Sequence, residues 1–115
     1  MPQRHCEPLL GRCSPVYNII MKTPATYIMA NKPNGTLYTG VTYNLIQRVY
    51  QHRSHAIDGF TKKYDCIILV YFELHATMEQ AIAFEKQIKA GSRADKIKLI
   101  ELANTTWRDL YPEIV

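Results

Sequence analysis

The stretch ATYIMANKPNGTLYTGVT, residues 25–42, decides the fold of this chain. Thr26 to Ala30 is a short apolar segment, and Thr36 to Thr42 is rich in β-branched and aromatic residues, as strands are. Between them stand Asn34 and Gly35, a dipeptide typical of tight hairpin turns in which both central residues take a positive φ. We therefore predict a β-hairpin over this stretch.

A helix is predicted directly after the hairpin. Apolar residues recur at helical spacing from Leu45 to Tyr50, and Thr42 or Asn44 can cap the helix start. The helical pattern fades over residues 54–59. The segment FTKKY, residues 60–64, follows and is interpreted as a basic, aromatic loop that leads into a third strand.

The second half of the chain adds that strand and two more helices. The apolar run CIILVYF, residues 66–72, is long enough for a buried strand, which we predict over residues 66–73. Thr77 and Gln80 have the spacing of a capping box for a helix that stops at Gly91, and Ser92 can cap the next helix. The expected buried residues are Ala81, Ile82, Phe84 and Ile88 in the first helix, and Trp107, Leu110 and Tyr111 in a tail that folds back.

The element order ββαβαα predicts an α+β fold, with a small three-stranded, mainly antiparallel sheet flanked by helices. The length of 115 residues, 47% of them hydrophobic, suits one domain. Residues 1–20 contain three prolines and no clear period, so we interpret them as a loosely ordered extension and residues 21–115 as the domain. The longest apolar run is too short to span a membrane and no signal peptide is recognisable, so a cytoplasmic protein is expected.

Charge and cysteine content narrow the class of partner. The three cysteines include no CxxC pair, which argues against a zinc site. The net charge of +4 suits a partner rich in phosphate, although a basic helix face can also simply be solvated. The candidate nucleic-acid-binding residues are Lys62, Lys63, Lys86, Lys89, Arg93, Lys96 and Lys98.

Five polar residues stand out by their order and spacing. Tyr27 and Tyr38 lie on the two hairpin strands, Arg48 and His52 lie four residues apart on the first helix, and Glu85 lies on the second. This constellation resembles the GIY-YIG nuclease superfamily, whose two namesake motifs lie on adjacent strands about this far apart.

The two motifs stand here as Ala25-Thr26-Tyr27 and Tyr38-Thr39-Gly40. Ala-Thr replaces Gly-Ile in the first motif, and Thr39 replaces Ile in the second. Both tyrosines are kept, so the differences affect packing and turn geometry more than chemistry. With FTKKY, EKQIK and WRDLYPE, the chain is similar to the small stand-alone branch of the superfamily over residues 21–114.

The resemblance implies a metal-dependent endonuclease that acts on DNA, with RNA not excluded. Arg48 matches the catalytic arginine, whose guanidinium fork suits a phosphate. Glu85 matches the metal-binding glutamate, which would hold Mg²⁺ or Mn²⁺. Tyr27 and Tyr38 would position or deprotonate the attacking water, and His52 would assist a proton relay or contact phosphate. No recognition helix or finger is evident, so a preferred nucleic-acid structure or a directing partner is expected.

Each of these residues also has an ordinary structural interpretation. Arg48 could be a surface residue, Glu85 could pair with Lys89 or Arg48, and the tyrosines and histidine could serve packing alone. A tyrosine acts as a base only where a cation lowers its pKa from about 10. A non-catalytic nucleic-acid-binding module of the same fold, or a protein-interaction domain, therefore stays an alternative.

Overall fold

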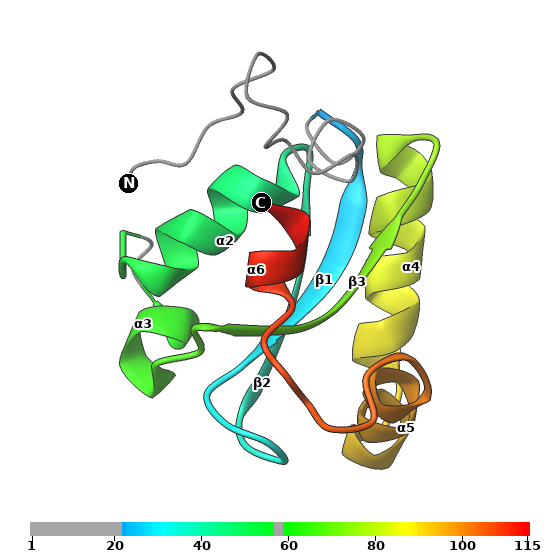
Figure 1. Ribbon diagram of the computed structural model, residues 1–115. Coiled ribbons are helices and arrows are strands. Elements are labelled where there is room, and N and C mark those ends of the chain that lie inside the picture. The colour runs from blue at the N-terminus through cyan, green and yellow to red at the C-terminus, as the bar shows by residue number, and fades with distance from the viewer. Residues whose placement is uncertain (1–21, 57–58) are drawn as a thin grey trace.

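A computed structural model describes residues 22–56 and 59–115, so the expected N-terminal extension lies outside the described residues. Its three strands form one antiparallel sheet in the order β2-β1-β3, with helices on both sides (Figure 1). This confirms the α+β class. The elements are β1 (Ala25–Ala30), β2 (Leu37–Thr42), α2 (Leu45–Arg53), α3 (Phe60–Tyr64), β3 (Ile68–Leu74), α4 (Met78–Ala90), α5 (Arg93–Ala103) and α6 (Tyr111–Ile114).

Two of these elements differ from the sequence prediction. Residues 60–64 form the one-turn helix α3, where a loop was expected, and residues 111–114 form a second single turn, α6. A single helical turn has too few residues for the helical spacing of apolar residues to be recognised in the sequence. Within the described residues, no helix has the length and apolar content needed to cross a bilayer.

The hairpin turn is centred one residue earlier than predicted. The amide of Gly35 donates to the carbonyl of Lys32 at 2.9 Å, which places Pro33 and Asn34 at the two central positions. Asn34 has a φ of 58°, whereas the only described glycine with a positive φ is Gly59. The expectation of positive φ at both Asn34 and Gly35 is therefore wrong, because Pro33 fixes the first central position of this turn.

Local capping bonds set the three longer helices. Asn44 accepts a hydrogen bond from the Gln47 amide at the start of α2, and Thr77 accepts one from Gln80 at the start of α4. Ser92 begins α5 with a complete capping box. These bonds satisfy amides that have no partner within a helix, which explains why the chain turns helical at these residues.

The sheet separates two apolar clusters. On one face, Tyr27 and Met29 pack with residues of α2 and α6, while on the other face Ile28 packs with residues of α4 and α5. Strand β1 is central and buried along its whole length, because both its edges are paired and both its faces are covered. The prediction that Ile82 belongs to the buried stripe of α4 is wrong, since that side chain lies at the surface.

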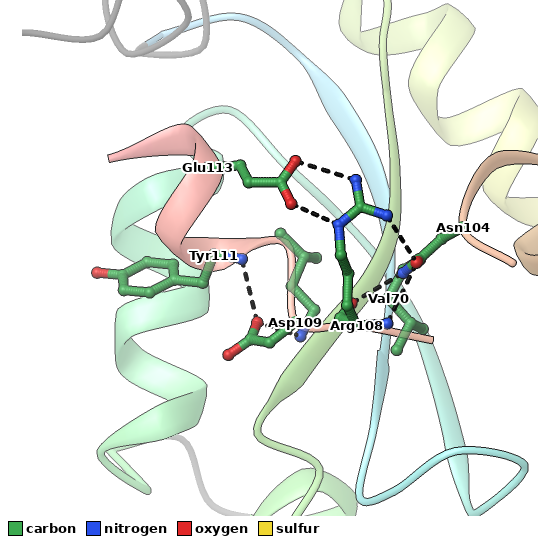
Figure 2. Close-up of polar contacts among 7 residues, drawn as sticks. Val70, Asn104, Arg108, Asp109, Tyr111 and Glu113 are labelled. Carbon is green, nitrogen blue, oxygen red and sulfur yellow. Dashed lines mark hydrogen bonds and ion pairs between the residues drawn. The ribbon is translucent and has the colours of Figure 1, made fainter. Parts of the chain in front are cut away.

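The segment after α5 is tied to β3 by polar contacts (Figure 2). The buried amide of Asn104 donates to the carbonyls of Val70 at 3.1 Å and Arg108 at 2.8 Å, and Arg108 reaches Glu113 in α6. The Leu110 amide donates to the Leu69 carbonyl at 2.8 Å. These bonds hold the tail against the sheet, where it covers the face that also receives α2.

Candidate active site

Tyr27 occupies the centre of the candidate site. It lies on β1, is fully buried, and faces Gly40 directly across the antiparallel pair with β2. A Cβ atom at Gly40 would fall 2.6 Å from the Tyr27 hydroxyl oxygen and 2.7 Å from the ring carbon that carries it. The phenol therefore lies over the glycine backbone, and any larger residue at this position would displace it.

His52 is the hydrogen-bond partner of that phenol. The Tyr27 hydroxyl and His52 Nε2 are 2.8 Å apart, and only 1% of the His52 side chain is exposed. Burial, assisted by the nearby charge of Arg48, lowers the pKa of His52 to about 4. The imidazole is therefore neutral at pH 7, and with its proton on Nδ1 it accepts the phenol hydrogen. Direct contact between His52 and a phosphate would require the side chain to move.

Tyr38 completes a cluster of three rings. Its ring centroid lies 6.3 Å from that of Tyr27 and 5.5 Å from that of His52, which are themselves 5.6 Å apart. Tyr38 is only partly buried, in contrast to Tyr27. Of the two tyrosines, Tyr38 is thus the one that a ligand at the surface can approach.

Arg48 lies one helical turn before His52 and reaches the same cluster. Its guanidinium group hydrogen-bonds the Tyr27 phenol, and its charge acts on both Tyr27 and His52. The side chain is half-buried. A cation held by a buried phenol beside partly exposed rings is well placed to bind an anion that arrives from solvent.

The pKa of Tyr27 bears on whether this residue can act as a base. Burial raises it well above its usual value of 10, the neighbouring Tyr38 raises it further, and Arg48 lowers it by less. The phenol stays protonated at neutral pH, so a cation is present but does not overcome burial. Tyr27 is therefore better suited to act as a hydrogen-bond donor than as a base that accepts a proton.

Glu85 approaches the cluster from α4. Its carboxylate is half-buried and acts electrostatically on Tyr27, which places it within range of the same phenol. It also forms an ion pair with Lys89, with a distance of 3.0 Å from Lys89 Nζ to Glu85 Oε2. Of the two ion pairs considered as the structural alternative for Glu85, the one with Lys89 is therefore present.

The donor set at Glu85 fits a magnesium-type ion. Among residues 22–56 and 59–115, no group of three or more His, Cys, Asp or Glu side chains converges on one point. A single carboxylate suits Mg²⁺ or Mn²⁺, which keeps several waters and takes further oxygens from substrate phosphates. It does not suit zinc, which needs three or four protein ligands.

The seven candidate cations for nucleic-acid binding are spread over three helices, and several have partners within the protein. Arg93 donates to the carbonyls of Asn34 and Gly35, each at 2.8 Å, and so holds the hairpin turn. Lys96 donates to the Gly91 carbonyl at 3.3 Å. Lys62 and Lys63 lie on α3, Lys86 and Lys89 on α4, and Arg93, Lys96 and Lys98 on α5.

One feature beside the site was missed by sequence reasoning. Phe60, on α3, has its ring centroid 6.1 Å from that of Tyr38, although 22 positions separate them in the sequence. The sequence shows that residues 60–64 are aromatic and basic, but the contact with Tyr38 depends on how the chain folds back after α2. No local pattern encodes that return.

The fold and this site define a class of protein, and comparison with known families agrees. Residues 23–98 match the family described as the GIY-YIG catalytic domain, and the chain belongs to that family. The recognition made from the two motifs is thus confirmed. At this level the chain is a nuclease-type domain.

The chain is also similar to proteins that carry the name UPF0213. The chain is 37% identical over 75 residues to a UPF0213 protein of Staphylococcus haemolyticus, covering 65% of this chain and 90% of that protein. It is 37% identical over 68 residues to a UPF0213 protein of Pediococcus pentosaceus, covering 59% and 72%. A solution NMR structure of a UPF0213 protein from Bacillus halodurans is 25% identical, with a TM-score of 0.49 over 76% of this chain and 92% of that one.

Proposed function

We propose that this protein is a metal-dependent endonuclease that hydrolyses phosphodiester bonds in DNA. The observation that carries the proposal is the gathering of Arg48 and Tyr38 around the buried Tyr27–His52 pair, with the Glu85 carboxylate acting electrostatically on Tyr27. A phosphate-binding cation, hydroxyl groups that can orient water and a metal-binding carboxylate are the parts that phosphodiester hydrolysis needs.

In this proposal Arg48 binds the non-bridging oxygens of the scissile phosphate. The Tyr27 phenol holds the guanidinium group, and helix α2 fixes it beside the rings. Charge that develops on the phosphoryl oxygens in the transition state is then met by a positioned fork of N–H donors. Arg48 would thus stabilise the transition state more strongly than the ground state.

The two tyrosines take different roles. Tyr38, partly exposed, orients the attacking water through its hydroxyl group. Tyr27, protonated and bonded to His52, fixes the position of Arg48 and keeps the polar centre of the site satisfied. His52 acts on Tyr27 and is a positioning residue in this scheme.

Glu85 would hold the ion. A bound Mg²⁺ or Mn²⁺ would act as a Lewis acid on the phosphate and stabilise charge on the leaving oxygen. Lys89 must release the carboxylate for this, and an ion pair with a half-exposed lysine is weak enough to break.

The first test is cleavage of labelled single-stranded, nicked, branched and duplex DNA, and of RNA, with and without Mg²⁺ or Mn²⁺. Glu85→Gln should abolish cleavage while DNA binding persists, because the ion serves the chemical step. Glu79→Gln, the same substitution at an exposed glutamate of the same helix, is the matched control and should retain cleavage. Cleavage by folded Glu85→Gln at the normal rate would overturn the assignment of Glu85.

The alternative is a non-catalytic nucleic-acid-binding module of the same fold. The Glu85–Lys89 ion pair favours it, since a carboxylate already paired needs no metal. In that case Arg48→Ala would lower affinity alone, and added metal would change neither affinity nor the DNA.

A further inference from the structure

Two exposed aromatic side chains lie together on α3. Phe60 is 45% exposed and Tyr64 is 41% exposed, and their ring centroids are 4.8 Å apart. Single apolar side chains on a surface need no explanation. These two contact each other and lie on one helical turn, so their exposed ring surface forms a continuous aromatic platform, defined here as Phe60 and Tyr64.

The platform is continuous with the candidate active site. The Phe60 ring centroid lies 6.1 Å from that of Tyr38, with the two ring planes tilted by 30°. Tyr38 in turn contacts Tyr27 and His52. An unbroken series of ring contacts thus leads from the buried phenol to the surface, and a ligand on the platform would lie directly beside the site.

Cations accompany the platform. Lys62 and Lys63 lie on the same turn with exposed side chains, and the Lys63 ammonium group lies 5.4 Å from the centre of the Tyr64 ring. Aromatic rings for bases, interleaved with cations for phosphates, are the composition of surfaces that hold single-stranded nucleic acid. The positive charge favours a polyanion over an apolar protein segment as the occupant.

We infer that Phe60 and Tyr64 form a stacking site for an unpaired nucleobase next to the scissile phosphate. In a duplex each base face is covered by its neighbour, so a protein ring can stack only on a base that is single-stranded or turned out of the helix. Stacking accepts any base, since every base has a π face. The substrate class is then a strand with an unpaired nucleotide at the cleavage position, without strict sequence preference.

The inference rests on the proposed function for the place of the phosphate, but its test does not require cleavage. The full chain is titrated, in EDTA, with single-stranded oligonucleotides that carry 2-aminopurine at successive positions, and with the matching duplexes. The fluorescence of 2-aminopurine is quenched when the base stacks. We expect quenching confined to one or two positions of the single strand and none in the duplex.

Substitutions then assign the quenching to the platform. Phe60→Ala is expected to abolish it and to weaken single-strand binding roughly 5- to 150-fold, with duplex binding unchanged within a factor of two. Phe60→Tyr keeps a ring and should retain both signals. Tyr43→Ala removes an aromatic side chain just before α2 that is even more exposed than Phe60, and it should have no effect. Melting curves of all variants establish that they are folded.

The outcomes separate the two proposals. Quenching that depends on Phe60, with no cleavage of any substrate, would support the stacking site and contradict the nuclease. Cleavage with no quenching, and with Phe60→Ala equal to the wild type on single strands, would overturn the stacking site and leave the nuclease standing. Equal affinity for single strand and duplex in EDTA would also overturn it.

Discussion

Gly40 and Tyr27 face each other across β2 and β1, and the phenol of Tyr27 occupies the space that a side chain at Gly40 would fill. The glycine of the second motif, Gly40, thus leaves the space in which the tyrosine of the first motif, Tyr27, packs. This relationship explains why both residues occur in one hairpin, and it couples the packing of the sheet to the geometry of the site. Tyr27 reaches His52 and Arg48 only because the strand beside it carries no Cβ at this point.

Gly40→Ala is therefore expected to damage both stability and activity. The methyl group must displace a fully buried ring, and overpacking of this kind costs about 1–3 kcal/mol. For a domain of this size the melting temperature should fall by roughly 4 °C or more. Cleavage should fall further than the folded fraction does, because the phenol leaves His52 and Arg48.

Gly91→Ala is the matched control for that experiment. The nearest atom to its new Cβ is Asp95 Oδ2 at 3.2 Å, which accepts the Ser92 amide in the capping box of α5, so any displacement falls on that exposed helix start and not on Tyr27. Activity per folded molecule should be unchanged. If Gly40→Ala cleaves as fast as Gly91→Ala, the proposed coupling between Gly40 and Tyr27 is wrong.

Substitutions of Arg48 and of a surface lysine should affect different kinetic quantities, the turnover rate and the binding affinity respectively. Arg48→Ala is expected to lower the turnover rate by about two or more orders of magnitude, because it removes donors that act on the transition state. Lys98→Ala should mainly weaken binding and flatten its salt dependence. Lys98 is a better comparison than Lys96, whose ammonium group is already bonded to the Gly91 carbonyl. Equal losses of affinity in both variants, with no cleavage by the wild type, would favour the non-catalytic module.

The regular elements of the fold could be predicted because their signals are local. The sequence predicts Thr77 and Ser92 as helix caps and leaves Thr42 and Asn44 as alternatives for α2; Asn44, Thr77 and Ser92 each accept a capping bond in the structure. The hairpin was found, but its turn was misplaced, because Pro33-Asn34 and Asn34-Gly35 are both favourable central pairs and they overlap. Which of the two pairs becomes central depends on the register of the strands, and a dipeptide carries no information about that register.

The site was predicted only as a set of residues, and its contacts were not. The Glu85–Lys89 ion pair could be anticipated because the two residues are four apart on one helix. The Tyr27–His52 bond joins residues 25 positions apart on a strand and a helix. Its consequence, a raised pKa of Tyr27, follows from burial that only the assembled fold creates.

Lys89→Ala is expected to ease metal binding at Glu85. The ion pair competes with the ion for one carboxylate, and partly exposed pairs of this kind are worth about 0.5 kcal/mol. The metal concentration for half-maximal cleavage should therefore fall about two- to threefold. Lys86→Ala removes the same charge from the same helix without breaking this pair, so it corrects for the loss of a surface cation. A metal requirement that is unchanged in Lys89→Ala would show that Lys89 does not compete with the ion.

The last prediction concerns acid stability and His52. Its pKa is lowered to about 4 in the folded protein, whereas an unfolded histidine titrates near 6.5. Between these values the unfolded chain binds a proton that the folded chain does not, so this residue makes stability fall as the pH falls. The contribution is fully present above about pH 6.5, and it changes by at most about 1.4 kcal/mol for each pH unit below that.

Melting temperatures measured between pH 8 and pH 4 test this sign. His52→Gln keeps a polar partner for the Tyr27 hydroxyl and cannot titrate, so its curve should be flatter than that of the wild type from about pH 6.5 downward. His55→Gln is the control, because His55 is exposed and pairs with Asp65 at 2.6 Å. Its curve should not flatten in the same way. Parallel curves for the wild type and His52→Gln would mean that His52 is not held neutral by its burial, and the donor role given to Tyr27 would lose its acceptor.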